Sequence, residues 1–260
     1  MSFRVNRRRF MAASAGLATG AAAARVVPAG TGQWGDLTGR LVYEGAAPER
    51  KKLKVDKDVD CCGKYDIRDE SLMVGPEGGL ANVYVYVRSR RVKICPELEE
   101  AVGDKVLLDN RDCIFKPHCM TVWITKQVYH IVNSDPIAQN VAFSPLGDVP
   151  ANIIMPPKGD PVDWKFRRSQ SIPVLVKCNY HPWESAYVLP KDHPYVAITD
   201  MDGVFRIPRL PTGELEFQVW QERTGYVDTP QWRRGRFKLT IQPGTNDLGT
   251  IKLPPALFAR

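Results

Sequence analysis

The residues best suited to chemistry form a short motif late in the chain. Cys178, His181 and Glu184 follow one another at intervals of three, within the segment Cys-Asn-Tyr-His-Pro-Trp-Glu. On a tight loop, a thiolate and an imidazole at this spacing can point at one metal ion, and a group three residues later can reach an axial position. A soft sulfur ligand together with an imidazole nitrogen suits copper in a trigonal site with a weak axial ligand. The motif therefore predicts a copper site.

A β-strand is expected to lead into this motif. Residues 173–177 are mostly β-branched or apolar, and similar runs occur at 80–87 and 120–125, with Gly, Pro and Asp clusters between such runs. Only residues 96–102 resemble a helical turn. The chain is 43% hydrophobic and 25% charged, as in globular proteins, and has 21 prolines. Short strands separated by turns predict an all-β sandwich or barrel.

The loop and three further landmarks resemble those of the cupredoxins. The match is with exported bacterial proteins labelled plastocyanin-like or methylamine-utilization-like, and it extends from Gly35 to about Lys252. The landmarks are residues 112–118 (Asp-Cys-Ile-Phe-Lys-Pro-His), 132–136 (Val-Asn-Ser-Asp-Pro) and 193–195 (His-Pro-Tyr). This resemblance implies a Greek-key β-sandwich and a one-electron copper carrier that serves a redox partner protein.

The same resemblance implies the metal ligands, two of which depart from the family pattern. Cys178 and His181 match. The first copper histidine typically stands in a His-Asn-Val setting, and here the corresponding residues read Gln-Asn-Val from Gln139. The customary axial methionine is replaced by Glu184. We therefore expect a metal site of Cys178, His181, Glu184 and Gln139, whose oxygen donors would stabilise the oxidised ion and lower the reduction potential.

Two alternatives to this ligand set stay open. The loop could be a relic without metal, in which Cys178 is simply buried and the packing of Trp183 and Pro182 keeps the loop shape. His118 could also replace the missing histidine if its strand lies beside the loop, although in the family this position is usually structural.

The C-terminal part of the chain resembles a second β module. Residues 195–208 read as a strand, an Asp-Gly turn and a strand, which is hairpin chemistry, and a further alternating strand follows. The pattern resembles the carboxypeptidase-regulatory-like β-sandwich, whose usual opening strand matches residues 35–43. We predict that residues 35–90 and 195–252 form one small transthyretin-like or carboxypeptidase-regulatory-like sandwich, with the cupredoxin-like domain inserted at 103–194. Two independent domains in series are the alternative.

The positive charge of the chain lies mostly in its first residues. The 260 residues carry a formal charge of +7, but residues 1–30 hold five arginines and no acid, which leaves +2 for the remainder. Residues 6–11 resemble the twin-arginine export motif, and the Ala-rich apolar stretch that follows is too short to span a bilayer. We predict a twin-arginine signal peptide over residues 1–30, cleaved near Ala24 or Ala29, and a periplasmic or exported location.

Six cysteines in an exported protein indicate disulfide chemistry. With Cys178 assigned to the metal, an odd number remains: Cys61, Cys62, Cys95, Cys113 and Cys119. The cupredoxin resemblance implies a disulfide between Cys113 and one member of the vicinal pair 61–62. A zinc-binding thiolate cluster, which lacks C-x-x-C spacing, and chelation of a metal by Cys113 and Cys119 around His118 are weaker alternatives.

Common catalytic and cofactor motifs are absent from the sequence, including G-x-S-x-G, H-E-x-x-H, the phosphate loop and C-x-x-C-H. We therefore expect no enzymatic activity, no nucleic-acid partner and no membrane span in the mature chain. The leading hypothesis is an exported copper-binding electron carrier, or a derivative with an altered site. The alternative is a metal-free β-sandwich module of the cell envelope that binds a carbohydrate or a protein, with Trp183, Trp220 and Trp232 as stacking surfaces.

Overall fold

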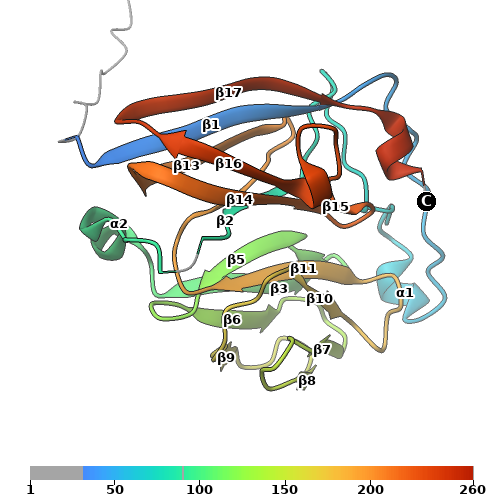
Figure 1. Cartoon of the computed structure of the whole chain (residues 1–260). Helices are drawn as coiled ribbons and strands as arrows, with labels where there is room; N and C mark the ends of the chain where they lie inside the picture. The colour runs from blue at the N-terminus through green and yellow to red at the C-terminus, as the bar shows by residue number, and fades with distance from the viewer. Residues whose placement is uncertain (1–31, 90, 260) are drawn as a thin grey trace, which may run out of the picture.

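The structure, a computed structural model, describes residues 32–89 and 91–259 (Figure 1). The predicted signal peptide over residues 1–30 lies outside the described residues. Among those described, no helix is long and apolar enough to cross a membrane. The helices are short and are α1 (Val59–Cys62), α2 (Pro96–Ala101), η1 (Arg233–Gly235) and η2 (Pro255–Phe258). Because all other regular structure within residues 32–89 and 91–259 is β, the prediction of an all-β fold is confirmed.

The upper half of Figure 1 is a sandwich of two sheets. Every second residue of its first strand is buried, and Leu37 and Leu41 have no exposed surface in the core between the sheets. One sheet has the order β13 (Val204–Pro211), β1 (Trp34–Tyr43) and β17 (Gly244–Leu253). The other has the order β12 (Val196–Ile198), β2 (Tyr84–Val87), β14 (Gly213–Gln221) and β15 (Gly225–Tyr226), and β16 (Arg236–Ile241) also pairs with β14.

The lower half of Figure 1 is a second sandwich. Its core contains fully buried Ile131, Val176 and Val188. One sheet has the order β5 (Cys119–Trp123), β11 (Ser185–Lys191), β10 (Val174–Lys177), β7 (Gln139–Phe143) and β8 (Ala151–Met155). The other has the order β4 (Ile114–Lys116), β3 (Lys105–Arg111), β6 (Val128–Asn133) and β9 (Val162–Trp164).

The two sandwiches are built from different parts of the chain. The strands of the upper sandwich lie within residues 34–87 and 196–253, and those of the lower sandwich lie within 105–191. The division into domains at the boundaries given above stays a prediction.

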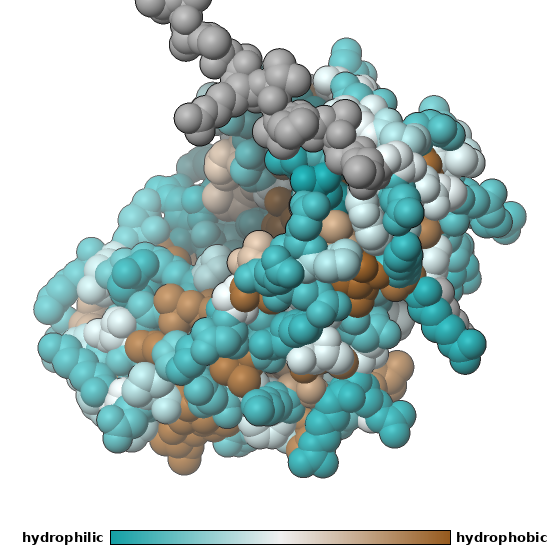
Figure 2. All heavy atoms as spheres, turned by 90° about the vertical axis from the view of Figure 1, so that its left-hand side faces the viewer, coloured by the Kyte–Doolittle hydropathy of each residue, from teal (hydrophilic) through white to brown (hydrophobic). Residues whose placement is uncertain are grey.

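On the face shown in Figure 2 the surface is mostly hydrophilic, and hydrophobic residues gather only in small groups.

Most of the predicted elements form. The runs at 120–125 and 173–177 contain β5 and β10, and the helical turn at 96–102 contains α2. In the run at 80–87 only the second half is a strand, because Asn82 has a left-handed φ of 61°, which β-strands do not tolerate.

The predicted hairpin over residues 195–208 is wrong in its pairing. The turn forms, since the Gly203 N–H donates to the Asp200 carbonyl at 2.9 Å. However, β12 pairs with β2 and β13 pairs with β1, so the two strands belong to opposite sheets. Ala197 and Phe205 enter the same core, and the turn therefore carries the chain from one face of that core to the other.

The two sandwiches meet where β2 and β14 pack against β5 and β11. Tyr84, which has no exposed surface, donates its hydroxyl to the Tyr187 carbonyl at 2.8 Å and accepts from the Met120 N–H at 3.0 Å. Trp220 packs edge-on against the Tyr84 ring, with 5.8 Å between ring centroids. A single buried phenol thus satisfies backbone groups of two strands in the other sandwich.

Replacing Tyr84 with Phe removes this hydroxyl and leaves the Met120 N–H buried without a partner. We expect Tyr84→Phe to lower the free energy of unfolding by about 1–3 kcal/mol, the usual penalty for an unsatisfied buried group. Urea denaturation measures the change. Tyr180→Phe is the matched control, because Tyr180 is exposed, and equal stability of the two variants would contradict the role of the hydroxyl.

Candidate metal centre

The Cys178–Glu184 loop is closed by the two strands that it connects. β10 and β11 are antiparallel, with Lys177 paired to Ser185. Two backbone hydrogen bonds tighten the loop: the Cys178 N–H donates to the Glu184 carbonyl at 3.2 Å, and the Glu184 N–H donates to the His181 carbonyl at 2.9 Å. The loop therefore turns its Cys, His and Glu side chains toward one point.

The four predicted ligand residues lie together at this point. The Cys178 Sγ and His181 Nδ1 atoms are 3.6 Å apart, and His181 Nδ1 is 3.4 Å from Glu184 Oε1. Gln139, the first residue of β7, places its Oε1 atom 2.6 Å from His181 Nδ1 and 3.5 Å from Cys178 Sγ. All four side chains are buried. Whether these residues bind a metal stays a prediction, but the structure does bring them into one cluster.

Glu184 is the least satisfied member of the cluster. It is 1% exposed, and neither of its carboxylate oxygens has a hydrogen-bond partner among the described residues. Burial raises the pKa of Glu184 to about 8, and burial followed by the charge of Glu184 raises the pKa of the Cys178 thiol. Buried acidic groups are normally paired or coordinate a metal. The unpartnered oxygens, beside a thiol and an imidazole, therefore fit a bound cation.

Asp135 sets the orientation of the Gln139 amide. The Gln139 Nε2–H donates to Asp135 Oδ2 at 3.1 Å. Asp135 is buried and also accepts the N–H groups of Asp112 at 2.9 Å and Cys113 at 3.0 Å. Because Asp135 accepts these hydrogen bonds, the amide nitrogen of Gln139 must face it. The amide oxygen is thereby the atom that faces the thiol and the imidazole.

Sequence reasoning missed Asp58. Its Oδ2 atom accepts the Nε2–H of His181 at 2.8 Å, across 123 positions in the sequence. Asp58 directly precedes α1 and has a left-handed φ of 43°. Metal-binding histidines almost always donate their second ring N–H in this way, which orients the ring. No local sequence pattern marks Asp58 as a functional residue. The predicted disulfide between Cys113 and the 61–62 pair was the only sequence-based indication that the segment containing Asp58 lies near the β core.

The predicted disulfide is confirmed, and its partner in the vicinal pair is Cys62. Cys62 and Cys113 are bonded, with 5.5 Å between their Cα atoms. The bond ties α1 to the turn between β3 and β4, so it holds Asp58 close to His181. Cys61 stays a free thiol. Its sulfur lies near the bonded pair, but disulfide sulfurs are not thiolates, so neither the zinc cluster nor chelation by Cys113 and Cys119 is correct.

His118 does not join the cluster. Its Nε2 atom contacts a carboxylate oxygen of Glu222, and its Nδ1 atom lies 3.6 Å from Glu70 Oε2, at the seam between the sandwiches. Burial acts to lower the pKa of His118, but the hydrogen bond to Glu222 and the negative charges of Glu222 and Glu70 together outweigh it, so the pKa is raised. His118 therefore serves an ion pair between the two sandwiches, and its proposal as a substitute ligand is wrong.

The three tryptophans offer little stacking surface. Trp220 and Trp232 are each 8% exposed and belong to hydrophobic cores. Trp183 lies against His181, with ring centroids 5.1 Å apart, and donates its Nε1–H to the Cys113 carbonyl at 3.0 Å. The expectation that these residues form a carbohydrate platform is therefore wrong for Trp220 and Trp232, and Trp183 helps to enclose the candidate metal site.

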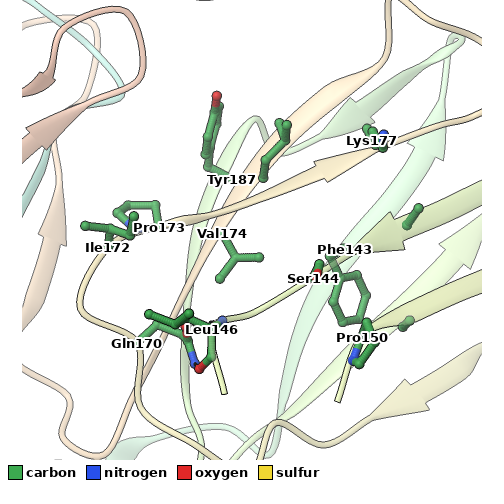
Figure 3. A pocket seen from close by; sticks show the side chains of 13 residues that line it. Phe143, Ser144, Leu146, Pro150, Gln170, Ile172, Pro173, Val174, Lys177 and Tyr187 are labelled. Carbon is green, nitrogen blue, oxygen red and sulfur yellow. Dashed lines mark hydrogen bonds between the residues drawn. The ribbon is translucent and has the colours of Figure 1, made fainter. Parts of the chain in front are cut away.

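A cavity of about 510 Å³ lies on the outer side of β7 and β10. Figure 3 shows its mostly apolar lining, with Leu146, Ile172 and Pro173 around it and Lys177 at one end. None of the four candidate ligands lines this cavity. The candidate metal site and this apolar hollow are thus separate features of the same sheet.

Comparison with known proteins leaves the family open. No family model and no curated protein matches the sequence. Among solved structures, a purple cupredoxin from Nitrosopumilus maritimus is 14% identical, with 34% of this chain and 100% of that chain covered and a TM-score of 0.28. Amicyanin from Paracoccus versutus is 16% identical, with 41% and 97% covered and a TM-score of 0.29.

A copper-containing nitrite reductase from Thermus scotoductus is 17% identical, with 38% of this chain and 27% of that chain covered and a TM-score of 0.28. Because the TM-scores of these three superpositions are below 0.3, we draw no conclusion about the function of the present chain from them. The description of its fold as an all-β protein with two sandwiches rests on its own strands and cores.

Replacing Glu184 with Met removes a carboxyl group that has no hydrogen-bond partner among the described residues from a buried site. We expect Glu184→Met to raise the free energy of unfolding of the metal-free protein by about 1–3 kcal/mol, because the cost of a buried unsatisfied group disappears. Urea denaturation in the presence of a chelator measures the difference. Glu77→Met, at a strongly exposed position, is the control. A Glu184→Met protein less stable than the parent would show that the carboxylate has a stabilising partner.

Proposed function

We propose that this protein binds copper through Cys178, His181, Gln139 and Glu184 and acts as a one-electron carrier. The observation that supports the proposal is the convergence of four donor atoms on one buried point, with the Glu184 oxygens otherwise unpartnered. Bonds of about 2.0–2.3 Å from a tetrahedral ion to nitrogen and sulfur would separate the donors by about 3.3–3.6 Å. The 3.6 Å between Cys178 Sγ and His181 Nδ1 and the 3.4 Å between His181 Nδ1 and Glu184 Oε1 fit this range. Gln139 Oε1 lies at hydrogen-bond distance, 2.6 Å, from His181 Nδ1, so these two atoms would have to move apart on metal binding.

The donor types favour copper. Thiolate and imidazole are shared by copper and zinc sites, and an amide oxygen such as that of Gln139 is also known as a ligand of copper in proteins. When bound, copper would supply one-electron oxidation and reduction. The carboxylate of Glu184 adds a hard, anionic oxygen, which favours the oxidised ion over the reduced one. We therefore expect a lower reduction potential than that of a site with two histidines and a methionine.

The surrounding residues would hold the donors still. Asp135 orients Gln139, and Asp58 orients His181. Both acceptors depend on the disulfide region, since Asp135 binds the Cys113 N–H and Asp58 precedes the helix that carries Cys62. A ligand set held by such hydrogen bonds changes little between oxidation states, as electron transfer requires.

We also propose that the protein is exported and meets its redox partner protein outside the cytoplasm. The twin-arginine motif at residues 6–11 supports export. The Cys62–Cys113 disulfide supports it independently, because disulfides persist in oxidising compartments and are rare in the cytosol.

Titration of the mature protein with Cu(II) tests the proposed site. We expect one equivalent to bind and to produce a thiolate-to-copper charge-transfer band, and we expect Cys178→Ser to abolish it. Cys119→Ser is the matched control, because Cys119 is also a buried free thiol but lies at the seam between the sandwiches. Copper that does not bind, or a band that survives in Cys178→Ser, would refute the proposal.

Removing Asp58 tests the orienting role of its carboxylate. We expect Asp58→Ala to weaken copper binding by about 10- to 100-fold, as found when partners of metal-bound histidines are lost. Competition with a chelator of known affinity measures the change. Asp58→Asn should recover part of it, because the amide oxygen still accepts a hydrogen bond. Asp56→Ala is the control, since Asp56 pairs with Lys54 at the surface, and an equal effect of both Ala variants would contradict the role.

A further inference from the structure

A cavity of about 740 Å³ lies between the two sandwiches, away from the candidate metal centre. Asp192 and His193, in the segment that leads from β11 to β12, line it, and Tyr86 and Arg88 contribute to it from the upper sandwich. In Figure 1 this segment runs on the left-hand side. Lys191, at the end of β11, contributes from the lower sandwich, and none of the candidate copper ligands lines the cavity. Its volume lies within the range of pockets that hold small ligands.

Lys191 is the unusual residue of this cavity. It is only 8% exposed, and its Nζ atom donates one hydrogen bond, to the Gln170 carbonyl at 3.3 Å. The same atom lies 5.4 Å from the centre of the Tyr86 ring. Among the described residues no carboxylate forms an ion pair with Lys191, and burial lowers its pKa. A buried ammonium has three N–H donors and is normally paired, so this lysine retains capacity for an anionic partner.

The other charged groups around the cavity leave an excess of positive charge. Arg88 and Arg91 line it together with Lys191, against the carboxylates of Asp192 and Glu216. Both carboxylates already have partners: Glu216 binds Arg88 at 2.8 Å, and Asp192 accepts the Ser169 hydroxyl at 3.2 Å. The cavity is therefore more favourable to an anion than to a cation.

The remaining lining is neutral and hydrogen-bonding. Ser89, Ser169 and Ser171 border the cavity, which gives it hydroxyl groups on both sandwiches. His193 also lines it, and burial lowers the pKa of His193 to about 4, so that its ring is neutral near pH 7. Hydroxyl groups and neutral polar groups of this kind match the hydroxyls of a sugar.

We propose that this cavity binds an acidic saccharide, and that the Lys191 ammonium receives its oxyanion. The ligand we expect is a sugar ring that carries a carboxylate or a sulfate ester. The Lys191 ammonium would donate its free N–H groups to that anionic group. Arg91 at the rim adds positive charge, and the serine hydroxyls bind the ring. The proposal does not depend on copper binding, since the two sites share no residue.

Titration of the mature protein with glucuronate, glucose 6-sulfate and neutral glucose tests the proposal. The titration is carried out at constant ionic strength, and binding is followed by amide chemical shifts. We expect at least one acidic sugar to bind at least tenfold more tightly than glucose. Whichever of glucuronate and glucose 6-sulfate binds more tightly identifies the preferred oxyanion as a carboxylate or a sulfate. Lys191→Met keeps the apolar stem over Tyr86 and removes the charge, and we expect it to weaken that binding at least tenfold.

Lys165→Met is the matched control, because Lys165 is exposed and does not line the cavity, and it should bind like the parent protein. If Lys191→Met does not fold, Arg91→Met at the exposed rim takes its place and should also weaken binding. The proposal is overturned if neither acidic sugar binds more tightly than glucose, or if the lining variant binds as tightly as the control.

Discussion

The buried carboxylate of Asp135 connects most of the parts from which the candidate metal centre is built. It accepts the amide of Gln139, which turns the Gln139 oxygen toward the thiol and the imidazole. It also accepts the N–H groups of Asp112 and Cys113, two residues with left-handed φ angles of 60° and 57°. Such backbone conformations persist only where the surroundings stabilise them. Through the disulfide of Cys113, the same carboxylate supports α1 and hence the Asp58 side chain that binds His181.

The seam between the sandwiches is the second constraint on the molecule. Tyr84 and the ion pair of His118 with Glu222 join the upper and lower halves through buried polar contacts. Buried polar groups fix one arrangement because any shift leaves them unsatisfied. The cavity around Lys191 lies along the same seam, so its lining depends on residues from both sandwiches. The candidate metal centre is instead built within the lower sandwich and covered by the segment around α1.

Local patterns predicted local features well. The spacing of Cys178, His181 and Glu184 was enough to place them on one loop, because strand, turn and strand are decided by neighbouring residues. The same reasoning failed for residues 195–208, where the Asp-Gly turn formed but its strands joined opposite sheets. Turn chemistry specifies the reversal of the chain, whereas the choice of partner strand depends on which core receives Phe205. Gln139 was identified only through the family resemblance.

The amino-acid sequence by itself determined the all-β character of the chain and the place of Cys178, His181 and Glu184 on one loop, and the family resemblance added the pairing of Cys113 with one of two adjacent cysteines. Tertiary structure alone decided which atom of Gln139 faces the loop, that Asp58 binds His181 and that His118 serves an ion pair. It also decided that Lys191 is buried with no ion-pair partner among the described residues. The physical reason is distance along the chain. Propensities and spacing act over a few residues, but hydrogen bonds and burial join groups such as Asp58 and His181 that only the packed fold brings together.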